Sequence, residues 1–524
     1  MAKILFAQEI FFPFQSIAKL SAYLKLKGHE VDLVIGDEHR IAAYAKTSNP
    51  SLIAFSVLTP YRNHMLVSAH AIKKAGVTAP IIAGGYDITF MPQILEYSDL
   101  DIICRGEGEE ALTELCDCLD NGKDYSGIAN LWVKKNGVVV KNSMRTWQMD
   151  MDQMPFDDRD IYLNYDSYFS IIPFMQVLAG RGCPYPCSYC FNRGYMDIYY
   201  AEGSRGYTKL RSPDHVIAEC IELRDKYKAK YIFFNYSTLT YNKRWILEFL
   251  SKYKDRVKVP FSINAVIREI DDEVGKALGD CGYCELVRFG LETGNEDFRV
   301  KILNKKLTNQ QFFDCTKILQ RYGIRYSMQM MLGLPGETLD NAWETIDIAH
   351  RLSTHDSVHG INLFKPFPGL EITNYGISIG QYKKEEISAF EPPDVVKQAA
   401  ATKSHAGDGC GIAEGDVLVA EPDDEAAPAM KALPLGTRKM VFFSNYRSDP
   451  EGQMILRLSR FSHLAIRLPW LRPLIRQLIK LPDNAVYRFI WLATESLLNI
   501  RAHARVPISF FVQYFLHHRG KQIR

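Results

Sequence analysis

The sequence has no uninterrupted apolar run of about eighteen residues, so it predicts no membrane-spanning helix. No opening signal peptide is expected either, because the apolar run at residues 4–7 is too short to serve as one. Apolar residues are nevertheless plentiful: 47% hydrophobic and 12% aromatic content excludes a disordered chain. With 524 residues the chain is too long for one ordinary core, and we expect two or three folded units.

A disulfide framework is not expected either. The chain contains eleven cysteines, an odd number, and it is long and carries no secretory signal. We therefore expect free thiols in a reducing cytoplasm.

Acidic residues are scarce at one end of the chain. Residues 451–524 carry twelve Lys and Arg against three Asp and Glu, a bias that suits nucleic acid or an anionic membrane surface. The arginines alternate with bulky apolar residues, as in 466–480, which favours peripheral contact with the inner face of a membrane over nucleic acid. The alternative is a helical cap packed on the rest of the protein.

Residues 1–145 alternate short apolar runs with helical stretches, which predicts a Rossmann-like, doubly wound α/β domain. A connector with a hairpin around Asn136-Gly137 should follow the last strand. The five expected strands lie near residues 4–6, 31–35, 52–55, 81–83 and 101–104.

A second βα series occupies residues 165–375 and predicts a partial (β/α)6 barrel. Residues 396–434 are rich in Ala, Gly, Asp and Glu and predict a flexible linker, and 440–524 predict a mainly helical, basic region. The expected barrel strands lie near residues 174–178, 231–234, 259–264, 285–289, 326–331 and 359–364.

Three cysteines, Cys183, Cys187 and Cys190, lie within eight residues directly after an expected strand. Three thiolates can hold a [4Fe–4S] cluster and leave one iron open to an outside ligand. The alternatives are a structural zinc site, for which no fourth ligand lies nearby, and unrelated buried thiols. We interpret Cys281 and Cys284, which precede a strand, as buried structural thiols.

The Cys-x3-Cys-x2-Cys spacing, with Tyr189 as the aromatic residue before the last cysteine, resembles the radical S-adenosylmethionine (SAM) superfamily. The resemblance implies that SAM binds the open iron and is cleaved reductively to a 5′-deoxyadenosyl radical. Segments 288–294 and 331–338 also look like strand ends of that family. The residues so implied for SAM binding are Tyr189, Glu292, Gly333 and Pro335.

Two of these assignments have structural alternatives. Glu292 could form a salt bridge with Arg288 or Arg299 instead of contacting SAM. The turn at Gly333 and Pro335 could be a plain connection between strand and helix.

The N-terminal domain resembles the cobalamin-binding domain that precedes the barrel in one branch of the superfamily. The loops at the carboxyl ends of its strands carry that resemblance, since ligands of doubly wound folds bind there. Residues 7–13 lack the histidine of an Asp-x-His-x-x-Gly loop, so axial histidine ligation is not expected. The alternative is a scaffold that has lost the cofactor. The implied cobalamin residues are Ser56, Thr59, Gly84, Gly85, Gly106 and Glu107.

Together these features predict a cobalamin-dependent radical SAM enzyme that methylates an unactivated carbon of a small-molecule or lipid substrate. The alternatives are radical cyclisation, rearrangement or carbon–carbon coupling without methyl transfer, and a non-catalytic iron–sulfur or zinc protein. Flavodoxin or ferredoxin would supply the electron, and no nucleic-acid partner is expected. Catalytic residues stay unassigned: Asn235, Tyr236 and His359 lie near strand ends, and we interpret them as structural polar residues.

Overall fold

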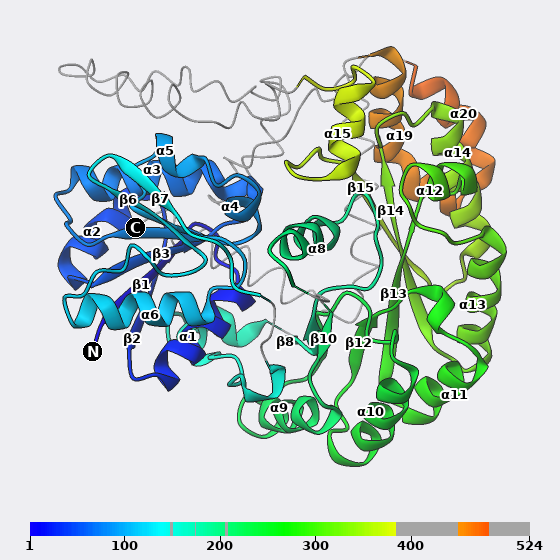
Figure 1. Cartoon of the computed structure of the whole chain (residues 1–524). Helices are drawn as coiled ribbons and strands as arrows, with labels where there is room; N and C mark the ends of the chain where they lie inside the picture. The colour runs from blue at the N-terminus through cyan, green and yellow to red at the C-terminus, as the bar shows by residue number, and fades with distance from the viewer. Residues whose placement is uncertain (147–149, 173, 205–207, 384–448, 481–524) are drawn as a thin grey trace.

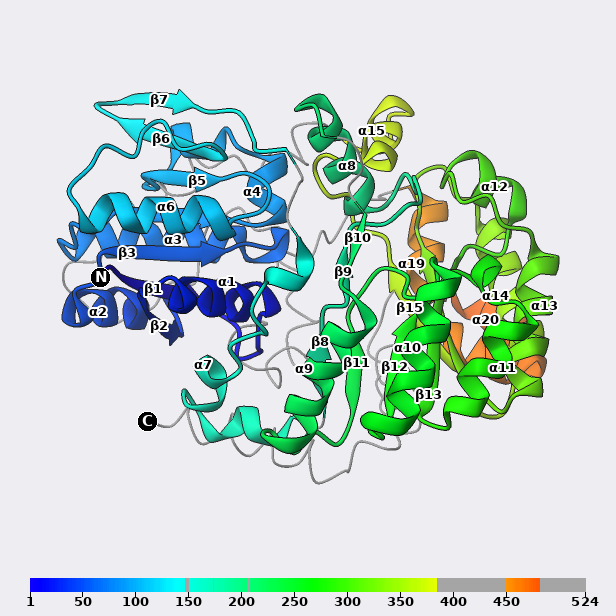
Figure 2. The same cartoon turned by 60° about the horizontal axis from the view of Figure 1, so that its bottom comes forward.

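Apolar strands alternating with helices build two α/β units, which lie beside each other with helix α8 (Phe191–Ala201) between them (Figures 1 and 2). The computed structural model describes residues 1–146, 150–172, 174–204, 208–383 and 449–480. The expected linker 396–434 lies outside the described residues.

The N-terminal unit has a seven-stranded sheet in the order β2-β1-β3-β4-β5-β6-β7. The first five strands pair in parallel, as a βα rhythm requires, because parallel neighbours need a crossover helix. The strands are β1 (Lys3–Gln8), β2 (Glu30–Ile35), β3 (Leu52–Ser56), β4 (Ile81–Gly84), β5 (Ile102–Cys104), β6 (Leu131–Lys135) and β7 (Val138–Lys141).

The hairpin predicted as part of a connector belongs to this sheet instead. β6 pairs antiparallel with β5, and β7 follows at the edge. The hairpin turn at Asn136-Gly137 was predicted correctly, since both residues have positive φ. The pairing of β6 with β5 is a non-local contact, and the turn sequence does not encode it.

Helices cover both faces of the sheet and give this unit two cores, one under α1 and α6 and one under α2 and α3. Strands buried on both faces read as continuous apolar runs, as Ile4-Leu5-Phe6 does. The helices are α1 (Gln15–Leu26), α2 (Glu38–Ser48), α3 (Arg62–Lys74), α4 (Tyr86–Phe90), α5 (Ile94–Tyr97) and α6 (Glu109–Asp120), with η1 (Thr59–Tyr61) before α3.

The second unit is a six-stranded parallel sheet in the order β8-β11-β12-β13-β14-β15, curved into the expected partial barrel. The β8 edge faces the N-terminal unit in both views (Figures 1 and 2). Its strands are β8 (Met175–Val177), β11 (Ile232–Phe234), β12 (Phe261–Asn264), β13 (Cys284–Glu292), β14 (Arg325–Leu332) and β15 (Val358–Leu363).

Most helices around this barrel begin at a side-chain cap that the sequence supplies. Asn242 accepts from the Trp245 amide, and Thr308 and Thr338 form capping boxes. The helices are α9 (Pro213–Asp225), α10 (Lys243–Arg256), α11 (Asp272–Cys281), α12 (Glu296–Lys301), α13 (Asn309–Arg321), α14 (Leu339–Leu352) and α15 (Glu371–Ser378).

Short elements lie between the two units and within the second one. The smaller elements are η2 (Met151–Gln153), α7 (Asp160–Leu163), η3 (Ser167–Ile171), the paired β9 (Gly180–Arg181) and β10 (Lys209–Leu210), and η4 (Ile267–Glu269).

The described part of the basic C-terminal region is helical, as expected. α19 (Pro450–Arg467) packs beside α14 and over β15, followed by η7 (Pro469–Leu471) and α20 (Arg472–Leu478). The apolar side of α19 is buried in the barrel core, which is the arrangement of a helical cap. Residues 481–524 lie outside the described part. Over the described ranges no helix is long and apolar enough to cross a membrane.

Candidate functional site

The three cysteines of the motif lie on one loop between β9 and α8. Gly182 starts the loop with φ of +80°, a conformation that glycine adopts without strain, and Cys190 is the residue before α8. The Cys190 amide donates to the Cys187 carbonyl at 3.1 Å, which folds the loop back on itself.

The surroundings of the three thiols suit an iron–sulfur cluster. Burial, with a smaller contribution from the neighbouring Cys190 and Cys187, raises the pKa of Cys183 to about 12, so the three sulfurs lie close enough to influence one another. A bound cation reverses this effect by stabilising the thiolates. Within the described ranges no three His, Cys, Asp or Glu side chains gather as ligands of a single metal ion. Three thiolates on one loop can each bind a separate iron of a cluster.

Two segments from the barrel anchor the cysteine loop. Ser188 donates from its amide to the Leu303 carbonyl at 3.1 Å and from its hydroxyl to the Ile302 carbonyl at 2.7 Å. On the other side, the Tyr185 hydroxyl donates to Glu269 Oε1 at 2.6 Å. The loop is thus fixed before any cofactor binds, which is how a site keeps its ligands in place.

Glu292 ends β13 beside this loop, and it has neither of the partners considered from sequence. Its Oε1 accepts from the Tyr189 hydroxyl at 2.8 Å and from Lys305 Nζ at 2.9 Å. Arg299 instead donates to backbone carbonyls, including that of Thr293 at 3.0 Å. Glu292 is only 9% exposed and has φ of +64°, an uncommon conformation for a residue with a side chain.

Tyr189 of the cysteine loop and Glu292 at the end of β13, both predicted to bind SAM, are therefore in direct contact. A buried carboxylate with a single lysine keeps acceptor capacity for a further donor, such as an amino or ribose hydroxyl group. The Glu292 carboxylate thus has the hydrogen-bonding capacity that SAM requires. The assignment of Tyr189 and Glu292 to SAM stays a prediction.

Gly333 and Pro335 form the turn between β14 and α14. The Glu337 side chain closes this turn by accepting from the Gly333 amide at 2.6 Å, and Gly333 has φ of +78°. The geometry is that of the strand-to-helix turn considered as an alternative. A role of Gly333 and Pro335 in SAM binding stays a prediction.

The predicted cobalamin loops gather at the carboxyl edge of the N-terminal sheet, as their positions after successive strands require. Ser56 ends β3, and its hydroxyl contacts that of Ser16 at 2.8 Å; Thr59 begins η1. Gly84 ends β4. Gly85 has φ of +105°, and a Cβ there would come within 2.7 Å of the Val57 carbonyl oxygen. Gly85 therefore serves the packing of two neighbouring loops of this edge.

Gly106 and Glu107 face helix α8. A Cβ on Gly106 would overlap the Tyr199 hydroxyl, and the Glu107 amide donates to that hydroxyl at 2.9 Å. This contact joins the predicted cobalamin edge to α8, the helix that directly follows Cys190. Whether cobalamin contacts these two residues stays a prediction.

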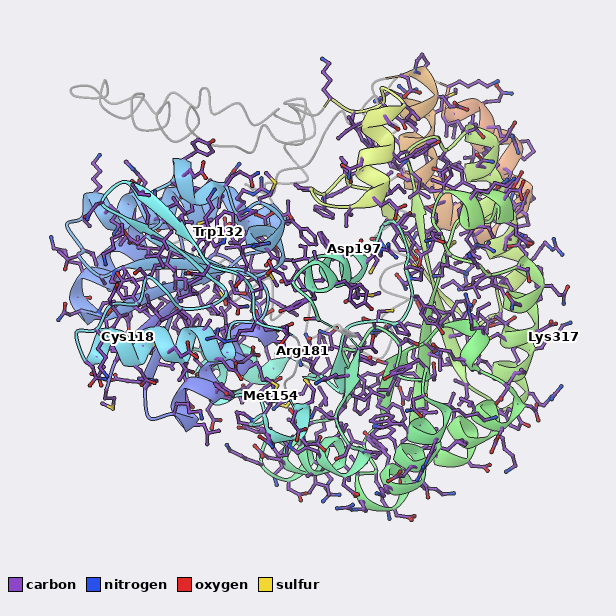
Figure 3. The ribbon with its side chains drawn as sticks, viewed as in Figure 1. Cys118, Trp132, Met154, Arg181, Asp197 and Lys317 are labelled. Carbon is purple, nitrogen blue, oxygen red and sulfur yellow. The ribbon has the colours of Figure 1, made fainter. Side chains whose placement is uncertain are left out.

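Arg181 lies between the two units, two residues before the first cysteine of the motif (Figure 3). Its Nη1 donates to Glu107 Oε2 at 2.5 Å, and its Nη2 donates to Glu109. Burial raises the pKa of Glu107 above its usual range, although Arg181 opposes the shift. The N-terminal edge is thus tied by a charged pair to the cysteine loop.

The polar residues near barrel strand ends differ in their surroundings. Asn235 bridges Gln15 and Gln176 at 3.0 and 3.1 Å. His359 points outward under α19, where burial lowers its pKa to about 3, and it contacts the Ser353 hydroxyl at 2.7 Å. Tyr236 is buried near Cys183, which raises its pKa beyond the effect of burial. His359 therefore has the structural role expected of it.

Cys281 and Cys284 are buried at the junction of α11 and β13, as interpreted from sequence. Burial raises the pKa of Cys281 to about 11. Inert packing thiols have this character.

Sequence reasoning missed Arg181, Lys305 and Glu337. Arg181 and Lys305 contact partners at least 13 residues away in the chain, so no local pattern identifies them. Glu337 falls within the segment 331–338 but was given no role, although its spacing of four residues from Gly333 is that of a side chain closing a turn.

Comparison with known protein families assigns both units. Residues 15–116 match the B12 binding domain, and residues 177–349 match the radical SAM superfamily. The two matched segments fall on the N-terminal sheet and on the barrel, respectively.

Two curated relatives match about two thirds of the chain. The chain is 27% identical over 357 residues to an uncharacterized methyltransferase of Pyrococcus horikoshii, covering 67% of this chain and 74% of the relative. It is 24% identical over 356 residues to the anaerobic magnesium-protoporphyrin IX monomethyl ester cyclase of Rubrivivax gelatinosus, covering 64% and 61%.

Two solved structures have a similar fold. The radical SAM methyltransferase TsrM of Kitasatospora setae aligns with a TM-score of 0.59 at 16% identity, covering 73% of this chain and 76% of TsrM. The cobalamin-dependent SAM radical enzyme OxsB aligns with a TM-score of 0.60 at 16% identity, covering 96% and 72%. At this identity the likeness concerns the fold.

The cysteine loop, the six-stranded barrel and the N-terminal sheet agree with both family matches. The cofactors of these families are a [4Fe–4S] cluster, SAM and cobalamin. The chain belongs to the radical SAM enzymes that carry an N-terminal B12-binding domain.

Proposed function

We propose that this enzyme is a cobalamin-dependent methyltransferase that acts on an unactivated carbon. The observation that carries the proposal is the pair of contacts from Arg181 to Glu107 and Glu109. They hold the carboxyl edge of the B12-binding sheet against the cysteine loop, so ligands of the two sites would face one space. Methyl transfer needs that proximity, because a methyl carrier must reach the carbon from which hydrogen is removed.

The cofactors supply the reactive chemistry when bound: reductive cleavage of SAM at the cluster, and methyl delivery by cobalamin. The protein supplies position. Cys183, Cys187 and Cys190 hold the cluster, and Glu292, set by Tyr189 and Lys305, offers an acceptor next to it. An electron donor such as flavodoxin or ferredoxin belongs to this proposal.

The names of two similar proteins support methyl transfer: the Pyrococcus horikoshii relative is called a methyltransferase, and so is TsrM. The name of the Rubrivivax gelatinosus relative favours a second candidate, radical cyclisation without methyl transfer. The two functions differ in what happens to SAM. Methyl transfer releases S-adenosylhomocysteine, and radical chemistry alone releases 5′-deoxyadenosine.

The test uses protein reconstituted anaerobically with iron, sulfide and cobalamin, then given SAM and a strong reductant. We expect about four irons per chain and S-adenosylhomocysteine that forms only when cobalamin is present. Release of 5′-deoxyadenosine with no S-adenosylhomocysteine would favour the cyclase candidate and contradict methyl transfer.

Cys187→Ala should lose most of its iron and all 5′-deoxyadenosine formation. Cys281→Ala is the matched control, because this thiol is also buried but lies outside the cysteine loop. Its iron content should equal that of the wild type.

A further inference from the structure

Arg288 lies in the middle of β13 and points into the barrel. Its strand neighbours Val287 and Phe289 are buried in the outer core, where Phe289 packs against Phe312 of α13 at a ring distance of 5.9 Å. Successive side chains of a strand point to opposite faces. Arg288 is therefore on the inner face, the face of Glu292 at the end of the same strand.

The Arg288 guanidinium rests on an aromatic ring inside the barrel. It lies 4.2 Å from the ring centroid of Phe233 on β11, two strands away. The strand between them, β12, carries the small residue Ser262 beside Phe233 in the register, so the long side chain can cross it. Stacking of this kind fixes the plane of a guanidinium while leaving its N–H groups free to donate.

No negative charge accompanies this cation. Among the described residues, Arg288 has no acidic side chain within ion-pair distance and no hydrogen-bond acceptor for its guanidinium. The nearest carboxylate on its strand face, Glu292, is already paired with Lys305. Arg288 is only partly exposed, and burial lowers its pKa, an effect that the nearby Tyr231 opposes. A half-buried, unpaired cation is costly to keep unless it has a ligand to bind.

We propose that Arg288 binds a carboxylate of the substrate inside the barrel. The planar fork of a guanidinium matches the two oxygens of a carboxylate, and the Phe233 ring sets its orientation. The inference rests on the proposed function only in that a substrate enters this barrel. It assigns the substrate class: a molecule with an acidic group that anchors it below the cluster.

The carboxylate of SAM is the other possible source of this chemistry. The Glu292 carboxylate lies back over Gly290 of its own strand, whereas the Arg288 side chain extends across β12 to the Phe233 ring on β11. The Arg288 guanidinium is therefore directed toward β11 and away from Glu292, the acceptor that is predicted to contact SAM. The site therefore favours the substrate, and the experiment separates the two sources.

The test measures binding of 3,3,3-trifluoropropionate to the cluster-containing protein by ¹⁹F NMR. We expect saturable binding that weakens at least about tenfold in Arg288→Gln, because a charge-assisted hydrogen-bonded pair is lost. The neutral trifluoropropionamide should not bind. Equal affinity of wild type and Arg288→Gln for the carboxylate, or no binding to either, would overturn the proposal.

Arg351→Gln is the matched control. Arg351 also lies over a phenylalanine ring, that of Phe313 at 4.6 Å, but it does so on outer helices. This variant should bind the fluorinated carboxylate like the wild type. Both variants should keep their iron content and circular dichroism, so that lost binding is not lost folding.

SAM affinity is measured on the same samples from the change it causes in the spectrum of the reduced cluster. It should be equal in wild type and Arg288→Gln, and a tenfold loss would assign Arg288 to SAM and overturn the substrate site. None of these measurements needs cobalamin or turnover. The binding results therefore do not depend on whether the enzyme transfers methyl groups. Likewise, the S-adenosylhomocysteine test does not depend on whether Arg288 binds a carboxylate.

Discussion

Glu292 combines a strained backbone with a buried carboxylate. A non-glycine residue with positive φ costs on the order of 1–3 kcal/mol, and such residues persist where their surroundings fix them. Here Tyr189 and Lys305 fix the side chain, and Gly290 leaves it room, because a Cβ at Gly290 would overlap the carboxylate. The strain holds an acceptor at the end of β13, next to the cysteine loop.

Gly290→Ala should displace Glu292 and weaken SAM binding by about tenfold or more, the loss expected for one charge-assisted hydrogen bond. Iron content should stay unchanged, since none of the three cysteines is touched. The measurement is a SAM titration of the reduced cluster by EPR. Gly127→Ala is the control, since a Cβ at Gly127 meets nothing within 4 Å. Unchanged SAM affinity in Gly290→Ala would contradict a role for Glu292.

Sequence could single out the three cysteines as candidate cluster ligands because their pattern is local, with fixed spacing on one loop. It could not identify Lys305 or Arg181, because a lysine or arginine has no meaning in a pattern until the fold supplies its partner. For Glu292 it named a plausible position and the wrong salt-bridge partners, Arg288 and Arg299. Both arginines are near in sequence, but one faces the barrel and the other caps carbonyls.

Helix α9 joins the barrel to the connector through a buried charge. Glu219 lies between Arg159 and Arg211, accepting from Arg159 Nη2 at 2.6 Å. Burial alone would raise the pKa of Glu219, but the two guanidinium groups outweigh it and hold that pKa well below its usual range. The ionised form is therefore the one that stabilises the fold.

Glu219→Gln should lower the melting temperature at pH 7 by several degrees, because two buried guanidinium groups lose their partner, a change worth about 3–5 kcal/mol. A depressed pKa gives stability that is present above the unfolded value, near 4.3, and lost as the pH falls toward the folded value. The difference in melting temperature between wild type and Glu219→Gln should thus be constant from pH 8 to about 5 and become smaller below about pH 4.

Differential scanning calorimetry across this pH range checks the expectation. Glu222→Gln, three residues further along α9, is the control and should shift the melting temperature little. If the difference in melting temperature between wild type and Glu219→Gln grew as the pH falls, it would contradict the conclusion that ionised Glu219 stabilises the fold.

The strands of the barrel were predicted to within two or three residues, because buried parallel strands are apolar, short and separated by capped helices. The β6–β7 hairpin was misplaced for the opposite reason. Its turn is encoded locally, but its pairing with β5 depends on which edge of the sheet is open.

The two units meet at α8 and Arg181, where the cysteine loop and the predicted cobalamin edge share contacts (Figure 3). One side chain therefore links the two cofactor sites. Such a link makes the position of one unit depend on the other.

Arg181→Gln should leave the iron content unchanged but release residues 105–109 from the cysteine loop. We expect faster hydrogen exchange at residues 105–109 and cobalamin binding weakened by about tenfold, since two carboxylates lose a buried cation. Hydrogen exchange with mass spectrometry and cobalamin titration by absorbance are the measurements.

Arg193→Gln is the control for Arg181, because its ion pair with Asp197 is exposed and contributes little. Exchange rates at 105–109 that match the wild type in Arg181→Gln would show that the charged pair does not join the units.

The helix that covers β15 comes from far along the chain. β15 ends at Leu363 and α19 begins at Pro450, and His359 and the outer side of α14 are buried only when α19 arrives. At about 5–20 residues per second, a ribosome releases α19 roughly 4–17 s after β15. For those seconds the apolar surface of β15 and α14 that α19 later covers is exposed. The barrel is therefore completed late in synthesis, and a chaperone could bind this surface until then.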